Sequence, residues 1–170
     1  AISPYIYGTN QDLIGGENFS FYRLGGNRMT GYNWVNNASN AGTDYFNNSD
    51  DYMTSIFGII GAAANAPASV LTTFYEQSTS KNAKCIITVP LAGYVAKDKS
   101  GVVSAGETAP SSRWCQTIPF KGSAFSLTPT LSSNSVFLDE EINFLVNKYG
   151  LSVNGGVKAY SLDNEPGLWS

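Results

Sequence analysis

Short runs of apolar, β-branched or aromatic residues alternate along the chain with stretches in which apolar residues recur at helical spacing. Strands are predicted where the short runs lie, at residues 4–10, 19–24, 84–91 and 157–162. The run at 84–91 is apolar almost throughout, which is typical of a strand buried on both faces of a parallel sheet. The sequence therefore predicts four strands of one parallel sheet.

Helices are predicted between these strands, at residues 50–60, 67–82 and 138–149. Asp50 and Asp51 can cap the first helix, and Pro67 is suited to the first position of the second. The third helix has acidic residues in its first turn and Lys148 in its last, as the helix dipole favours, and Gly150 can end it.

Two long segments lack this regular pattern. Residues 30–48 form a polar stretch that contains several aromatic residues, which favours a binding loop over a disordered one. Residues 95–129 are rich in serine and glycine and are predicted to form an excursion, with a hairpin between residues 102–103 and 120–127.

Alternating strands and helices indicate an α/β fold, and each predicted strand leads into polar or aromatic residues: Asn10, Asn27, Tyr94 and Glu165. In α/β barrels the carboxyl ends of the strands carry the active site, so these residues are expected to converge. Arg23 lies within an apolar strand and needs an anionic partner. That partner is either an active-site carboxylate or one half of a structural ion pair.

The composition of the chain excludes several classes of partner and of catalytic site. The net charge of −3 argues against nucleic acid or an anionic membrane as partner, and no apolar run is long enough to span a membrane. The chain has no histidine, which excludes Ser-His-Asp catalysis and histidine-ligated metals within it. Low charge with many aromatic and asparagine residues suits carbohydrate binding. It is also common in secreted proteins.

Several motifs together resemble glycoside hydrolase family 44. They are Arg-Leu-Gly-Gly-Asn-Arg at 23–28, Thr-Gly-Tyr-Asn-Trp at 30–34, Pro-Leu-Ala-Gly-Tyr-Val at 90–95, Phe-Leu-Val-Asn-Lys-Tyr-Gly at 144–150 and Leu-Asp-Asn-Glu-Pro at 162–166. The similarity extends through essentially all 170 residues. Asn-Glu-Pro alone is shared by many retaining glycosidases, whereas the Arg-Leu-Gly-Gly-Asn-Arg block makes the match specific. One departure is Val35, where the family pattern leads us to expect an acidic residue.

The resemblance implies a (β/α)8 TIM barrel, of which residues 1–170 supply roughly the first four β/α units, usually with an added β-sandwich domain. It implies a retaining endo-β-1,4-glucanase acting on cellulose-like chains, often with xylan or xyloglucan activity. Glu165 would be the general acid/base, Asn164 would bond the sugar 2-OH, and Arg23 would support the nucleophilic glutamate. Further residues expected to line the cleft are Asn10, Asn33, Trp34, Tyr94 and Trp169.

The same resemblance places the nucleophile on the seventh strand, outside this chain. We therefore expect the rest of the barrel to be present as a nicked or separate chain or as further residues, and this chain alone to be inactive. The expected partner is a β-glucan, the expected location is extracellular in a bacterium, and no cofactor is required. A structural Ca²⁺ near Asp44, Asp50 and Asp51 is one interpretation of those carboxylates, and helix capping in a solvated loop is the other.

Two other classes stay open at this point. A non-catalytic carbohydrate-binding module would explain the aromatic residues and the low charge, but such modules are usually all-β, and the helix at 138–149 argues against one. A doubly wound binding domain would fit the length of the chain. It would not explain the polar residues at the strand ends.

Overall fold

The computed structural model describes residues 2–10 and 19–165. Its strands are β1 (Gly8–Asn10), β2 (Phe21–Leu24), β3 (Ser39–Asn40), β4 (Asn48–Asp50), β5 (Lys84–Val89), β6 (Tyr94–Ala96), β7 (Gly101–Val102), β8 (Trp114–Ile118), β9 (Ser135–Phe137) and β10 (Ala159–Leu162). Its α-helices are α1 (Asn27–Thr30), α2 (Tyr52–Ile56), α3 (Ser69–Ser80) and α4 (Leu138–Tyr149). Short 3-10 helices are η1 (Pro4–Ile6), η2 (Gly42–Tyr45), η3 (Gly61–Asn65), η4 (Ala105–Glu107) and η5 (Ser152–Asn154).

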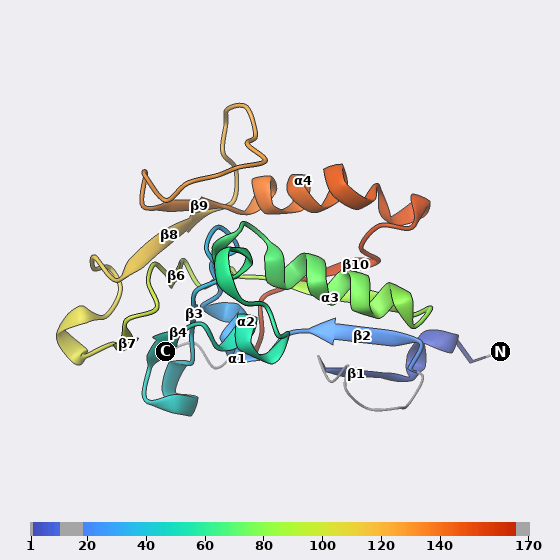
Figure 1. Ribbon diagram of the computed structural model, residues 1–170, viewed down its shortest axis with the longest axis horizontal. Coiled ribbons are helices and arrows are strands. Elements are labelled where there is room, and N and C mark those ends of the chain that lie inside the picture. Colours follow the sequence, from blue (N-terminus) through green and yellow to red (C-terminus); the bar gives the residue numbers. More distant parts are fainter. Residues whose placement is uncertain (1, 11–18, 166–170) are drawn as a thin grey trace.

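The main sheet has four strands in the order β1-β2-β5-β10, and every neighbouring pair is parallel. Its spatial order is the order along the chain, and α3 and α4 connect successive strands (Figure 1). The register pairs Arg23 with Asn10 on one side and with Ile86 on the other. The predicted α/β class with a parallel sheet is therefore confirmed, and the sheet excludes an all-β binding module.

The core lies between this sheet and its helices. Tyr22 and Leu24 of β2 are buried and alternate with half-buried Phe21 and Arg23, so β2 turns one face to the core and the other away. Buried partners come from β5, α3 and α4: Cys85, Ile87, Val70, Leu71, Phe74 and Leu145. This alternation places the side chain of Arg23 on the face of the sheet opposite the helix-packed core.

Two small sheets lie at the carboxyl end of the main sheet, with strand orders β3-β4-β7 and β6-β8-β9. Strands β3, β7 and β8 form within the segments for which a loop and a hairpin are predicted, whereas β9 lies beyond them. The predicted hairpin is wrong: Gly101–Val102 pairs with β4, and residues 120–127 contain no strand. Strand β8 pairs instead with β6 and β9.

Several predicted boundaries also need correction, and the strands predicted at 19–24, 84–91 and 157–162 are Phe21–Leu24, Lys84–Val89 and Ala159–Leu162. Pro4 begins a 3-10 turn capped by the Ser3 side chain, so the first strand is only β1. Helix α2 ends at Ile56 because Gly58 adopts a positive φ of 66° soon afterwards. Helix α3 begins at Ser69, after Pro67, so the proline does not open it. Helix α4 has the predicted bounds.

The outer strands of the main sheet carry exposed apolar side chains. Leu162 of β10 is 68% exposed, and Ile6 and Tyr7 before β1 are 64% and 69% exposed. Within residues 2–10 and 19–165, β1 and β10 each pair with one strand only. Apolar side chains beside an open strand edge favour pairing with further chain. No helix in the same residues is long and apolar enough to cross a membrane.

Candidate active site

Polar side chains from three strand ends meet at the carboxyl edge of the main sheet. Arg23 donates from Nη1 to Oδ1 of Asn10 over 2.9 Å and from Nη2 to Oδ1 of Asn164 over 2.8 Å. Arg23 is half-buried and Asn164 is buried. The strand ends therefore bring Asn10, Arg23 and Asn164 together, and within the described residues the arginine bonds two amide oxygens instead of the anionic partner expected for it.

Glu165 lies beside this group and is exposed. The amide nitrogen Nδ2 of Asn164 is 3.2 Å from Oε2 of Glu165 and also 3.2 Å from Oδ1 of Asn27. Because the arginine fixes the oxygen of the Asn164 amide, its two N–H groups are left to face Glu165 and Asn27. A carboxyl group that is open to solvent and held by an oriented donor can exchange a proton with a bound ligand.

Asp163 fixes the turn that carries these residues, a role that the sequence pattern does not identify. Its buried carboxylate accepts from the backbone N–H groups of Leu91 and Ala92, from the N–H of Asn164 over 2.6 Å and from the hydroxyl of Thr30 over 2.7 Å. It thereby joins the end of β10 to the turn after β5 and to α1. Asp163 also has a positive φ of 62°, a conformation that Asp tolerates better than most residues.

A cavity of about 440 Å³ opens in front of Glu165. Tyr94 and Trp114 supply its aromatic lining, and Asn27 and Asn164 supply polar groups. The indole N–H of Trp114 donates to the backbone oxygen of Glu107 over 2.9 Å, which fixes the ring. Aromatic and neutral polar groups around a carboxyl suit a sugar ring, which presents apolar faces and hydroxyl edges.

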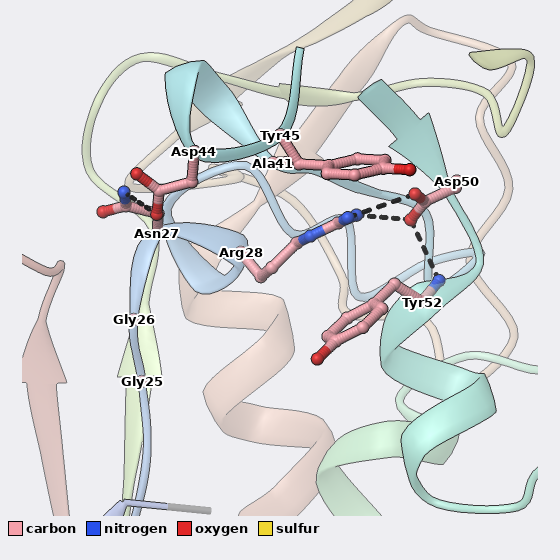
Figure 2. A pocket seen from close by; sticks show the side chains of 9 residues that line it. All are labelled: Gly25, Gly26, Asn27, Arg28, Ala41, Asp44, Tyr45, Asp50 and Tyr52. Atoms are coloured by element: carbon pink, nitrogen blue, oxygen red, sulfur yellow. Dashed lines mark hydrogen bonds and ion pairs between the residues drawn. The ribbon is translucent and has the colours of Figure 1, made fainter. Parts of the chain in front are cut away.

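A second cavity, of about 580 Å³, shares Asn27 and Asp44 with the first. Figure 2 shows Arg28 reaching across it to Asp50, with Tyr45 and Tyr52 on either side. The guanidinium pairs with the two carboxyl oxygens of Asp50 through Nη1 and Nη2 and lies 4.6 Å from the centroid of the Tyr52 ring. Burial raises the pKa of Asp50, but hydrogen bonds from Arg28, the Tyr52 N–H and Asn48 outweigh it, so that the pKa lies below its usual value.

Two predicted cleft residues are placed elsewhere. Asn33 and Trp34 have no exposed surface. Asn33 donates to the backbone oxygen of Ala96 and accepts from the N–H of Val35, while Trp34 packs against Phe144 with ring centroids 5.7 Å apart. Additional chain can only increase burial, so their placement does not fit the expected contact with substrate. Trp169 lies outside the described residues.

Within the described ranges, the three aspartates considered as ligands for a cation do not share a hydrogen-bond partner. Asp44 accepts from Asn27, Asp50 pairs with Arg28, and Asp51 begins α2 without a side-chain capping bond. Across the described part of the chain, no group of three or more Asp, Glu, Cys or His side chains could hold a metal ion. Asp50 accepts from the N–H of Tyr52, the first residue of α2, over 3.0 Å, so a bond to the helix start comes from Asp50 and not from the cap residue Asp51.

Comparison with known proteins matches this chain to one glycoside hydrolase family and to two endoglucanases. The sequence profile of glycoside hydrolase family 44 matches residues 38–170. The chain is 54% identical over 171 residues to endoglucanase A of Paenibacillus lautus and 53% identical over 170 residues to the β-mannanase/endoglucanase A of Caldicellulosiruptor saccharolyticus. These alignments cover 100% and 99% of the chain but 24% and 13% of the relatives.

A solved structure that matches this chain belongs to the same family. The chain superimposes with a TM-score of 0.96 and 53% identity on a Paenibacillus polymyxa xyloglucanase from family 44, in a structure that contains xyloglucan. The match covers 99% of this chain and 33% of that enzyme. This chain therefore spans a third or less of the length of the proteins that it resembles.

Proposed function

Because this chain belongs to glycoside hydrolase family 44, we propose that it is the N-terminal part of the catalytic domain of a retaining endo-β-1,4-glucanase. This proposal is supported by the arrangement of Arg23 on β2 and of Asn164 and exposed Glu165 after β10, all at the carboxyl edge of one parallel sheet. That edge is where barrel enzymes carry their catalytic residues.

Residues 1–170 would form the first four β/α units of a (β/α)8 TIM barrel. In support, β1, β2, β5 and β10 are parallel and follow one another in chain order. The outer strands have exposed apolar side chains such as Leu162, which a fifth strand would cover. The remaining units, as further residues or a second chain, would close the barrel and supply the nucleophile, and a β-sandwich domain would be added outside it.

Glu165 would act twice in the reaction, opposite a nucleophilic carboxylate about 5–5.5 Å away. First it donates its proton to the glycosidic oxygen while the nucleophile attacks the anomeric carbon. The bond to the leaving sugar breaks, and a covalent glycosyl ester forms. The ionised Glu165 then takes a proton from water as the water oxygen attacks that carbon and releases the nucleophile.

The neighbouring residues would orient this chemistry. Asn164 directs an N–H toward Glu165 and would also bond the sugar 2-OH, while Arg23 holds the amide in that orientation. Asn10 completes the arginine's hydrogen bonds on the other side. Tyr94 would provide an aromatic face for a sugar in the cavity, together with Trp114, which sequence patterns do not single out.

The substrate would be a polysaccharide with a β-1,4-linked backbone, because the relatives include an endoglucanase, a β-mannanase/endoglucanase and a xyloglucanase. The low charge of the chain and the aromatic lining of the cavity support a neutral glycan. We further propose an extracellular bacterial location and chemistry that needs no cofactor, with any Ca²⁺ serving structure alone.

The test uses the complete protein and its Glu165→Gln variant on carboxymethyl cellulose, xyloglucan, xylan and mannan. Wild type should release reducing ends from at least one β-1,4-glucan, and Glu165→Gln should lose 10²-fold or more, since general acid catalysis contributes about 10²–10⁴-fold. Glu76→Gln, an exposed change on α3, is the matched control and should keep full activity. An unaffected Glu165→Gln variant would contradict the assignment.

A further inference from the structure

The amide of Asn164 belongs to a longer chain of hydrogen bonds that runs from Arg23 to Asp44. Arg23 donates to Oδ1 of Asn164 over 2.8 Å, and Nδ2 of Asn164 donates to Oδ1 of Asn27 over 3.2 Å. Nδ2 of Asn27 in turn donates to Oδ2 of Asp44, a bond that Figure 2 shows beside the Arg28 cavity. Four side chains from three separate segments thus form one relay, Arg23–Asn164–Asn27–Asp44.

The two ends of this relay permit only one orientation of the amides between them. A guanidinium can only donate and an ionised carboxylate can only accept, whereas an asparagine amide can do both and can turn over. Asp44 therefore draws the NH2 of Asn27 toward itself and leaves its oxygen facing Asn164. If the Asn27 amide were turned over, its oxygen would face an oxygen of Asp44 and its NH2 group would face the NH2 group of Asn164.

The position of Asp44 does not depend on its own bond in the relay. Asp44 lies in η2, and Asn40 holds that segment by donating to the backbone oxygen of Asn47 and to Ser49 Oγ and by accepting from the N–H of Gly42. Asn40 is itself buried. A change at Asp44 should consequently alter the relay without unfolding the segment.

We infer that Asp44 is a positioning residue that acts through Asn27 to orient the Asn164 amide toward Glu165. Asp44 lies in the wall shared by both cavities. A polysaccharide in the cavity in front of Glu165 would exclude water and strengthen the relay when the reaction takes place. The inference rests on the proposed function for its catalytic consequence, but the relay itself can be tested without activity.

The experiment compares variants of the complete protein by kcat, KM and melting temperature. Asp44→Asn keeps the shape of the side chain but lets position 44 donate, so that Asn27 can turn over. We expect kcat to fall about 3- to 10-fold, the usual effect of one hydrogen bond, with a smaller change in KM. Asp51→Asn removes the same charge nearby without touching the relay and should stay within about 2-fold of wild type.

The decisive variant exchanges the two side chains. Asn27→Asp alone places two carboxylates face to face and should be more damaging than Asp44→Asn. The double variant Asn27→Asp/Asp44→Asn again has an acceptor-only group at position 27, which can accept from both neighbours. It should recover kcat to within about 3-fold of wild type and exceed both single variants, a rescue that general structural damage would not give.

Each outcome decides the inference. It is overturned if Asp44→Asn has the activity of Asp51→Asn, or if the exchange variant fails to exceed both single variants. If the wild type hydrolyses none of the β-glucans, the proposed function fails. The relay is then judged by melting temperature alone: recovery in the exchange variant supports it, and simple addition of the two single effects refutes it.

Discussion

Glu141, in the first turn of α4, should make the stability of the protein depend on pH. Its side chain is fully buried, and neither carboxyl oxygen has a hydrogen-bond partner in the described part of the chain. Burial raises its pKa from 4.5 to about 8. The titratable groups around it are Tyr32 and Tyr160, whose own pKa values are raised by burial and then by the proximity of Glu141. Glu141 is therefore an uncharged acid in the folded protein near neutral pH.

The sign and size of the effect follow from proton linkage. Between pH 4.5 and about 8 the unfolded chain releases the Glu141 proton and the folded chain keeps it. The free energy of unfolding therefore falls as pH rises, by about 1.4 kcal/mol per pH unit in this window. The Glu141→Gln variant has no ionisable side chain at position 141. Its stability relative to wild type should increase by about 3 kcal/mol from pH 5 to pH 7.5.

Urea unfolding of the complete protein at both pH values measures this difference. Glu140→Gln is the matched control, because Glu140 is equally buried on the same helix but pairs with Lys121 and accepts from the N–H of Ser126. Breaking that pair should destabilise the protein by about 1–3 kcal/mol, since it leaves the half-buried Lys121 cation without its partner. A Glu141→Gln difference that is the same at pH 5 and pH 7.5 would refute the reasoning.

Three other substitutions have defined outcomes in the complete protein. Asp163→Asn replaces a carboxylate that accepts four N–H or O–H groups, so it should lower the melting temperature and reduce kcat more than 10-fold in the same kinetic assay. Trp114→Ala removes an aromatic wall of the cavity and should raise KM for polysaccharide about 3- to 10-fold, measured in steady state. Arg28→Lys loses the two-pronged contact with Asp50 and should cost about 1 kcal/mol in urea unfolding without changing KM, and a large KM effect would contradict that role.

The main sheet could be predicted because its strands have strong local signals. The apolar run that becomes β5 and the amphipathic helix α4 specify their own conformations. The polar ends of β1 and β10 converge because parallel strands share one carboxyl edge, which is a property of the topology. Asn10 and Glu165 could thus be placed at one edge from the strand pattern, whereas the site roles of Arg23 and Asn164 were implied by the family resemblance.

The small sheets and the buried loop residues could not be predicted in this way. Strands β3 and β4 are two and three polar residues long, and their pairing depends on side-chain bonds such as those of Asn40. Trp34 is an aromatic residue in a polar segment and resembles an exposed sugar platform. It is buried because Phe144 from α4, more than a hundred residues later, packs on it.

If Glu165 is the acid/base of a retaining glycosidase, azide should rescue the Glu165→Ala variant of the complete protein. With an aryl cello-oligosaccharide whose leaving group needs no protonation, the variant should form the glycosyl-enzyme and then stall, because no base activates water. Azide needs no base. We predict that it restores turnover and yields a β-glycosyl azide, whereas full activity without azide, no rescue, or an α-configured product would contradict the account.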